Sequence, residues 1–417
     1  MSAVPPHLPV YIGSDALAEL TRFCRAQGLD KFTLVADRNT YAALGERGEA
    51  ALRDQGCDVL TVLLEADDII ADARAVMQVL LALDRTPRTY LAVGSGTITD
   101  VTRFVSHRTG REFISLPTAP SVDGYTSIGE PMAVDGIKLT VAAHGPLAVF
   151  ADLPTLCAAP RPLIAAGFGD MLAKFTSTAD WELGSLLWGE PFDAAIAARS
   201  RKATWACAEK ADAIAAASEE GVATLMAGLI ESGFCMLDFG ETRPASGYEH
   251  HVSHFWEMKL LREGRHSVLH GAKVGIAVLA SARRYDAVRR MSRAEAATRL
   301  ARTPLPDREA LQSSIRTAYG PIAEQVIAIQ TPFLELTAAD FEALKQKVLV
   351  NWDAIQRVAA AVPPAAAIEG WLRRVGGPVA GREIGLAADE VSQGIVYGQY
   401  YRNRFTIARL SGLFGIS

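Results

Sequence analysis

The first 117 residues alternate short β-rich segments with helical segments, and this alternation limits the possible folds most. The β-rich segments lie at residues 31–37, 57–64, 90–93 and 113–117, and the helical patterns lie at residues 41–56, 69–83 and 97–106. Strands that alternate with helices of this length are typical of a parallel sheet with crossover helices. The sequence therefore predicts an N-terminal Rossmann-like α/β domain.

The pattern changes after this region. Residues 129–150 carry Asp135-Gly136 between apolar-rich segments, which predicts an inserted β-hairpin at the edge of the first domain. From about residue 160 the β-rich segments stop, and long helices rich in Ala, Leu, Glu and Arg follow, broken by Pro and Gly. A chain of 417 residues exceeds the size of most single cores. We expect an α/β domain at 1–160 and an all-α domain at 161–417, with the boundary near 155–165.

Composition excludes several classes of protein. The formal net charge is −5 and no long Lys/Arg run occurs, so a nucleic-acid partner is not expected. The five cysteines form no CxxC pair, which argues against a disulfide framework or a thiolate zinc site. The first residues lack a basic region followed by an apolar core, and we see no run of about 18 apolar residues. We expect a cytoplasmic protein with no membrane partner.

Five of the eight histidines fall between residues 246 and 271, namely His250, His251, His254, His266 and His270. His250 and His254 are four residues apart, which places them on one face of a helix. His270 is far enough along the chain to lie on a neighbouring helix. Since neutral imidazole is the commonest metal ligand, the cluster indicates a metal site. The alternative, that a histidine is solvated or caps a helix end, applies above all to His251 and His266.

Asp170 and Lys174 lie one helical turn apart in the segment 164–184. They can form an ordinary ion pair along a helix. Alternatively, Asp170 adds a carboxylate to two imidazoles, which is a common ligand set for a divalent ion.

The segment GSGTITD, residues 94–100, follows a β-rich segment and opens a helical one. Gly94 and Gly96 let the backbone approach an anion closely, and the N–H groups at a helix start favour a phosphate. Position 99 is Thr, so the common GxGxxG pattern is absent, and a plain strand-to-helix turn is the alternative.

Two further acids follow predicted strands, where ligands bind in open α/β sheets. Asp123 lies in the loop 115–129 and is either a ligand contact or a turn residue. Asp37 ends the first β-rich segment. It can hold the ribose hydroxyls of NAD or cap a helix, and the adjacent Arg38 can accept the 2′-phosphate of NADP.

Five motifs occur in an order and spacing that resemble the glycerol-1-phosphate dehydrogenases, most closely the bacterial arabinose-operon type. They are GSGTITD, PTAPSVDGYTS, GFGDMLAKFTSTADWELG, SGYEHHVSHFWEM and LHGAKVG. This family is grouped with glycerol dehydrogenases, iron-containing alcohol dehydrogenases and dehydroquinate synthases. The resemblance implies a dehydroquinate synthase-like fold, in which 1–160 binds NAD or NADP and 161–417 binds metal and substrate. It also implies a homodimer.

The resemblance assigns roles to single positions. It implies cofactor contacts at Gly94, Ser95, Gly96, Thr97, Asp100, Thr118, Ser121 and Ser127. It implies metal ligation by Asp170, His250 and His270, with substrate also near Asp170, and it makes Asp123 and His254 the catalytic, substrate-contacting pair. No role carries over to His251. Thr99 replaces a His found in some relatives, which leaves the choice between NAD and NADP open.

The implied reaction is the reversible, metal-dependent reduction of dihydroxyacetone phosphate to sn-glycerol 1-phosphate, a step of lipid biosynthesis. Zinc, nickel and iron all suit one carboxylate with two imidazoles. Lys174 and Lys138 are candidates to bind the substrate phosphate. The alternatives are a dehydrogenase of another polyol, a dehydroquinate synthase-like cyclase, whose first ligand is Glu rather than Asp, and a relative that only binds nucleotide.

Overall fold

The computed structural model describes residues 8–66, 68–134 and 137–416. Its N-terminal part contains a six-stranded parallel sheet in the order β1-β8-β5-β4-β2-β3. The strands of this sheet are β1 (Val10–Gly13), β2 (Lys31–Asp37), β3 (Asp58–Leu64), β4 (Thr89–Gly94), β5 (Phe113–Pro117) and β8 (Val149–Asp152). The helices of this part are α1 (Ala16–Ala26), α2 (Arg38–Thr40), α3 (Glu46–Arg53), α4 (Ala73–Ala82), α5 (Gly96–Arg108) and α6 (Leu153–Cys157), with a π-helical turn at Tyr41–Gly45.

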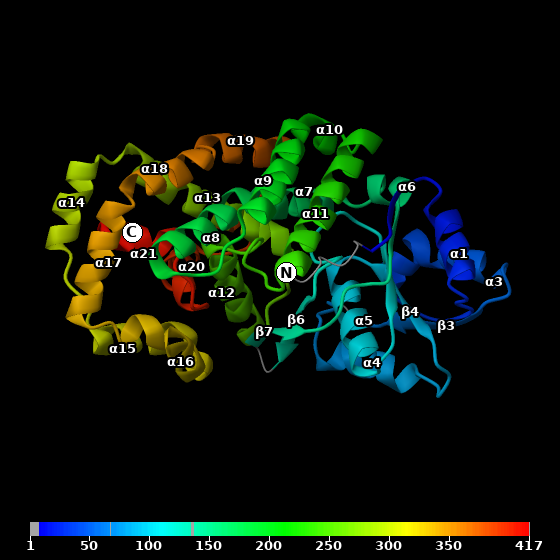
Figure 1. Ribbon diagram of the computed structural model, residues 1–417. Coiled ribbons are helices and arrows are strands. Elements are labelled where there is room, and N and C mark those ends of the chain that lie inside the picture. The colour runs from blue at the N-terminus through cyan, green and yellow to red at the C-terminus, as the bar shows by residue number, and fades with distance from the viewer. Residues whose placement is uncertain (1–7, 67, 135–136, 417) are drawn as a thin grey trace.

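Alternate residues of the central strands enter two separate cores. Leu34 and Leu91 pack with α1 and α3 on one face of the sheet, whereas Val35 and Ala92 pack with α4 and α5 on the other. Successive side chains of a strand point to opposite faces, so a sheet covered on both sides requires continuous apolar strands. The predicted parallel α/β sheet is therefore confirmed (Figure 1).

Some predicted elements differ from the observed ones. The helix expected from residue 69 begins at Ala73, because the side chain of Asp72 caps it by accepting the backbone N–H of Ala75 at 2.9 Å. The strands β1 and β8 were not predicted. They pair with each other in register Val10↔Val149. The two strands lie so far apart in the chain that no local sequence pattern predicts the pairing.

The inserted hairpin is present as β6 (Gly129–Val134) and β7 (Ile137–Ala142), which pair antiparallel and form a sheet of their own. It is shorter than the predicted segment 129–150, whose last residues belong to β8 of the main sheet. It contacts α5 on one side and α12 on the other. In Figure 1 it lies between the α/β part and the helical part. The predicted turn residues Asp135 and Gly136 lie outside the described residues.

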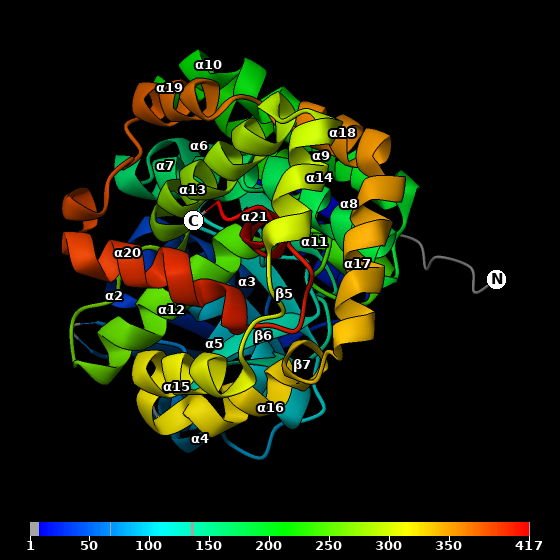
Figure 2. The same cartoon turned by 90° about the vertical axis from the view of Figure 1, so that its left-hand side faces the viewer.

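The remainder of the described chain is helical and forms the other half of the molecule (Figures 1 and 2). Its helices are α7 (Arg161–Leu172), α8 (Lys174–Trp188), α9 (Ala194–Glu209), α10 (Ala211–Ala215), α11 (Glu219–Phe239), α12 (Tyr248–Arg262), α13 (His270–Arg290), α14 (Arg293–Arg302), α15 (Arg308–Tyr319), α16 (Ala323–Leu334), α17 (Ala338–Val350), α18 (Trp352–Ala361), α19 (Ala365–Val375), α20 (Ala388–Tyr397) and α21 (Ile407–Leu413). The all-α character expected here is confirmed for the described residues, and the division at residue 160 stays a prediction.

Within the described residues, one helix is long and apolar enough to cross a membrane by length and composition alone. This helix is α11, and 61% of its most apolar stretch is buried inside the protein. It packs against α9, α7 and α10. Core helices of globular proteins have the same composition when they are covered on most sides.

Candidate active site

Asp170 and His270 meet because α7 and α13 approach each other very closely. A Cβ atom on Gly271 would lie 1.9 Å from the carbonyl oxygen of Ala166, and one on Gly169 would lie 2.5 Å from that of Gly271. Real Cβ atoms are not found so close to backbone atoms, so only glycine permits this helix crossing. The glycines next to Asp170 and His270 therefore place the two side chains on facing surfaces.

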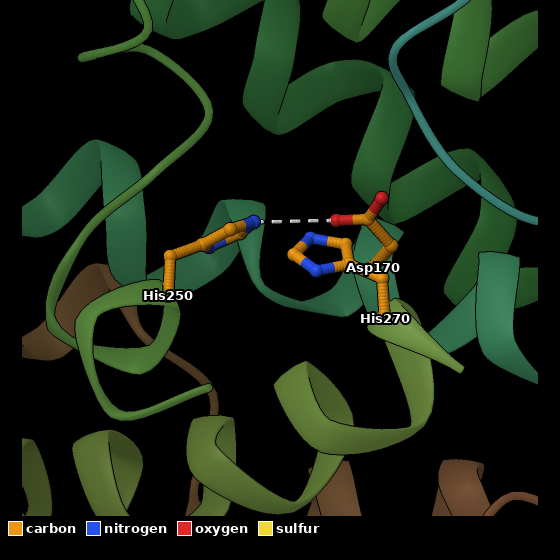
Figure 3. Close-up of side chains that lie close together, drawn as sticks. All are labelled: Asp170, His250 and His270. Carbon is orange, nitrogen blue, oxygen red and sulfur yellow. Dashed lines mark ion pairs between the residues drawn. The ribbon is translucent and has the colours of Figure 1, made fainter. Parts of the chain in front are cut away.

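His250 joins this pair from α12. Its Nε2 lies 3.5 Å from Oδ1 of Asp170, and its ring centroid lies 5.4 Å from that of His270. One potential ligand atom from each of the three residues lies within 4.8 Å of the others. Figure 3 shows the three side chains pointing toward one another. The structure thus brings together the three residues that the sequence suggested as metal ligands.

Glu249 fixes the orientation of the His250 ring. Its Oε1 accepts the Nδ1–H of His250 at 2.8 Å and the backbone N–H of Gly247 at 2.7 Å, and its Oε2 accepts the hydroxyl of Thr176 at 2.8 Å. Because Nδ1 is held by Glu249, Nε2 is the ring nitrogen that faces Asp170. Sequence reasoning missed Glu249, since adjacent residues of a helix normally face different ways.

Lys174 is fully buried and forms ion pairs with two carboxylates at once. Its Nζ lies 2.9 Å from Oδ1 of Asp170 and 2.8 Å from Oδ2 of Asp123, and it donates to the carbonyl of Ala245 at 3.1 Å. Burial alone would raise the pKa of Asp170, but Lys174 and His250 outweigh it and hold that pKa well below its usual range. With these contacts Lys174 is a structural cation, which argues against its predicted role in phosphate binding.

Asp123 reaches the same cluster from the loop after β5. Its backbone N–H donates to Oδ2 of Asp170 at 3.0 Å, and its Oδ2 accepts the hydroxyl of Ser232 at 2.8 Å. Asp123 therefore connects the α/β part to the helical part at the site itself.

His254 lies one helical turn beyond His250, and its ring stacks on that of His270 at 5.6 Å between centroids. Burial lowers the pKa of His254 to about 3, so its ring is neutral at physiological pH. Its Nδ1 lies 3.5 Å from Oε2 of Glu257, which in turn pairs with Lys138 at 2.7 Å and Lys273 at 3.6 Å. A second grouping of possible ligands, His254, Glu257 and His270, thus has two lysines on its carboxylate, which disfavours a cation there.

The chemistry of the first cluster fits a divalent ion. Its donors are one carboxylate and two imidazoles, and burial lowers the pKa of His270 so that its ring is the neutral, ligating form. Nδ1 of His270 is buried without a hydrogen-bond partner among the described residues. The Glu249 contact supplies the carboxylate that commonly supports a histidine ligand. Asp170, His250 and His270 would hold the ion.

The turn from β4 into α5 fits a nucleotide phosphate. Ser95 is the N-cap residue of α5, but its side chain caps no backbone N–H, so the N–H groups of the first turn remain available. A Cβ on Gly94 would lie 2.5 Å from Ile98, and one on Gly96 would lie 3.0 Å from Val122. Gly94 is thus required for the close packing of this turn, and Gly96 keeps it in tight contact with Val122.

A cavity of about 250 Å³ joins the two sites. Of the predicted site residues, those lining it are Ser95, Gly96, Thr97, Asp100, Ser121, Asp123, Ser127, Lys138, His250, His254 and His270. Asp170 is fully buried and is not among the residues that line the cavity. Ile69, Ile70 and Ala71, which sequence reasoning had placed in a helix, form part of the lining instead. Asp68 closes this side by accepting the N–H of Ser267 at 2.8 Å and its hydroxyl at 2.6 Å.

Other predicted residues lie outside the cavity lining. Gly94 and Thr118 are neighbours below the turn, where the Thr118 N–H donates to the Gly94 carbonyl at 3.2 Å. Asp37 caps α2 by accepting the N–H of Thr40 at 2.8 Å, which is the helix-cap alternative. His266 is exposed, whereas His251 is buried with both ring nitrogens lacking hydrogen-bond partners among the described residues.

We expect substitution of Glu249 to weaken metal binding. Glu249→Ala removes the acceptor that holds His250 with Nε2 toward Asp170, and loss of such a supporting contact typically costs 10–100-fold in metal affinity, that is about one to two orders of magnitude. Competition with a coloured chelator measures this affinity. Glu249→Gln, which keeps an acceptor oxygen, should lose less. Equal affinity in Glu249→Ala and the unmodified protein would contradict the role.

Asp100 makes stability depend on pH. Burial raises the pKa of Asp100 to about 7, against the opposing effect of Arg103. The folded protein therefore favours the neutral acid, and stability is lost as pH rises from the ordinary value near 3.8 through 7, by about 4 kcal/mol in total. Asp100→Asn cannot ionise, so it should gain stability relative to the unmodified protein between pH 5 and pH 8. Urea unfolding at both pH values tests this, and a pH-independent difference would refute it.

Comparison with known proteins places this arrangement in a family. A model of the iron-containing alcohol dehydrogenases matches residues 11–160. Glycerol-1-phosphate dehydrogenase [NAD(P)+] of Geobacillus thermodenitrificans is 35% identical over 95% of this chain and 90% of its own length. The enzyme of the same name from Bacillus velezensis is 38% identical over 95% of this chain and 89% of its own length.

Solved structures agree on the fold. A probable glycerol dehydrogenase from Sinorhizobium meliloti superposes with a TM-score of 0.60 at 16% identity, covering 98% of this chain and 96% of its own. A 1,3-propanediol oxidoreductase superposes with a TM-score of 0.62 at 13% identity, covering 99% of both chains. By its sequence relatives and its fold, the chain belongs to the glycerol-1-phosphate dehydrogenase family of the iron-containing alcohol dehydrogenases.

Proposed function

We propose that this protein reversibly reduces dihydroxyacetone phosphate to sn-glycerol 1-phosphate with NADH or NADPH and a divalent ion of zinc, nickel or iron. This proposal rests on one observation. Asp170, His250 and His270 converge beside a cavity, and the glycine turn of α5 lines the same cavity. The names of the relatives, glycerol-1-phosphate dehydrogenase [NAD(P)+], support the substrate and the cofactor.

Each bound group has a defined contribution. A divalent ion held by Asp170, His250 and His270 would supply Lewis acidity toward the substrate carbonyl oxygen. A bound reduced nicotinamide would supply the hydride, and the solvent would supply the proton that completes the alcohol. The protein's own residues bind these groups, orient them and exclude water.

The residues around the cluster act mainly by positioning. Lys174 holds the carboxylates of Asp123 and Asp170 in fixed places, and Glu249 keeps Nε2 of His250 facing Asp170. Such fixed geometry lowers the entropic cost of bringing substrate and cofactor together. His254 is neutral and lines the cavity, so it can donate a hydrogen bond to a substrate hydroxyl or accept one from it.

The proposed cofactor contacts lie among the residues that line the cavity. The N–H groups of Gly96 and Thr97 would face the pyrophosphate, and the hydroxyls of Ser121 and Ser127 lie on the loop that follows β5. Asp100 lies on the same helix as this turn. Asp37 caps α2, so both NADH and NADPH belong in the assay.

The test is an assay of dihydroxyacetone phosphate reduction with NADH and with NADPH, after reconstitution with zinc, nickel or iron, followed by chiral analysis of the product. Formation of sn-glycerol 1-phosphate supports the proposal. Formation of the opposite enantiomer, or reduction only of other polyol precursors, would replace it. Release of inorganic phosphate from a heptulosonate phosphate would favour a cyclase, although Asp170 stands where such enzymes have Glu. Absence of any redox turnover would favour a nucleotide-binding relative.

On the same family resemblance, we propose that the protein is a homodimer. We also propose that it acts in the cytoplasm on this small phosphorylated substrate and has neither nucleic acid nor membrane as a partner. Light scattering coupled to size-exclusion chromatography measures the oligomeric state, and a monomeric mass would remove that part of the proposal.

A further inference from the structure

The described cavity contains a cation that the reaction outlined above does not use. Arg402 lies in the segment between α20 and α21, far along the chain from every motif discussed so far, and its side chain lines the same cavity as His250 and His270. We propose that the Arg402 guanidinium binds the phosphate group of the substrate and so selects phosphorylated over unphosphorylated ketones. This proposal deepens the proposed function and rests on it.

The surroundings of Arg402 hold its guanidinium in one orientation. Nη2 donates to the hydroxyl of Thr140 on β7 at 2.9 Å and to that of Tyr401 at 3.3 Å. The guanidinium also lies over the Tyr401 ring, with Cζ 4.6 Å from its centroid. A guanidinium carries five N–H donors. Both hydrogen bonds use Nη2, so the N–H groups of Nη1 and Nε are not occupied by these contacts. A planar, preoriented donor set of this kind matches phosphate oxygens.

Charge distinguishes Arg402 from the other cations near the cavity. Lys174 is committed to Asp123 and Asp170, and Lys138 and Lys273 both face Glu257. For Arg402, no carboxylate lies within ion-pair distance among the residues that the structure describes. An anion entering the cavity therefore meets a guanidinium whose charge no nearby carboxylate cancels.

The position of Arg402 suits a short substrate. His254 stacks on His270, the Tyr401 ring lies 5.1 Å from that of His254, and the Arg402 guanidinium covers Tyr401. Arg402 is thus one aromatic ring away from the histidine cluster. In dihydroxyacetone phosphate, only a methylene and an ester oxygen separate the carbonyl carbon from the phosphorus. If the carbonyl lies at the histidine cluster, the phosphate of the same molecule would point toward Arg402.

A second arginine holds this segment in place. Arg404 is partly buried, and it donates to the carbonyl of Ser246 at 2.5 Å and to the hydroxyl of Thr242 at 3.0 Å. Thr242 and Ser246 both line the cavity close to the start of α12. The C-terminal segment is therefore fixed to the wall that carries His250, which keeps Arg402 at a constant distance from the cluster.

Arg402→Met tests the proposal in the full-length, metal-reconstituted protein. The KM for dihydroxyacetone phosphate should rise by about 10–100-fold, the cost of losing a charged hydrogen-bond donor, while kcat changes far less. Inorganic phosphate, used as a competitive inhibitor, should weaken by a similar factor. Metal content and the dissociation constant of NADH should stay unchanged. Arg402→Lys keeps a point charge, so it should recover part of the KM and provides the test if Arg402→Met fails to fold.

Arg382→Met is the matched control, because Arg382 is an exposed arginine of the same C-terminal region that does not line the cavity. An unchanged KM and an unchanged phosphate inhibition constant in Arg402→Met would overturn the inference. Parallel loss of NADH binding and metal would also overturn it, since Arg402 would then act through the structure. If the unmodified protein itself does not reduce dihydroxyacetone phosphate, the proposed function fails, whatever the Arg402 variants do.

Discussion

Replacing His270 with Ala is expected to remove the bound ion and lower kcat/KM by about 1,000-fold or more, since Lewis-acid stabilisation of several kcal/mol is lost. His270 is the first residue of α13 and its side chain lines the cavity, so its removal opens no void in the core. The thermal unfolding temperature without metal and the dissociation constant of NADH should therefore stay close to those of the unmodified protein. Elemental analysis of the dialysed variant measures the metal.

The matched control is His266→Ala. His266 lies four residues earlier and its side chain is 92% exposed, so this variant should keep its metal and its activity. Near-normal turnover of metal-stripped His270→Ala protein would refute the assigned role. Loss of metal together with unfolding would show instead that the ring supports the structure.

Replacing Lys174 with Met is expected to destabilise the protein by about 3–5 kcal/mol, the usual cost of removing one partner of a buried ion pair. Lys174 is the cation that pairs with both Asp123 and Asp170, and its loss would leave two carboxylates next to each other without a counter-charge. Both carboxylates must then be desolvated or protonated in the folded state. The midpoint of urea unfolding, measured without metal, reports this change.

Addition of the divalent ion should recover part of the stability of Lys174→Met, because the ion brings positive charge to Asp170 and binds only the folded state. Lys202→Met is the control, since Lys202 is an exposed lysine on α9, away from the site. An unfolding midpoint equal to that of the unmodified protein would contradict the structural role of Lys174. It would return Lys174 to the list of phosphate-binding candidates.

Local sequence patterns predicted the strands β2, β3, β4 and β5 of the sheet, but not β1 and β8. The strands at residues 31–37 and 113–117 were predicted to the residue, because they are apolar runs covered on both faces and bounded by turn residues. The pairing of β1 with β8 could not be predicted, since both strands are short and their partners are far apart in the chain. The helix expected from residue 69 begins later because its N-cap is Asp72, so Ile69 to Ala71 are free to line the cavity.

Within the site, the sequence by itself determined the residue types and their periodicity. The four-residue spacing of His250 and His254, the position of Asp170, and the glycine turn at Gly94 and Gly96 all follow from the chain alone. Helical and turn geometry link such spacings directly to a shared face or a phosphate-facing N-terminus.

Only the tertiary structure decided which of these groups interact. The glycine contact between α7 and α13 places Asp170 next to His270, and Glu249 orients the ring of His250. Lys174 pairs with two carboxylates and is therefore not available to bind a ligand. Arg402, from the C-terminal end of the chain, lines the same cavity. The physical reason is that charge neutralisation and burial depend on distances in space, and helix packing sets those distances between residues that no sequence spacing connects.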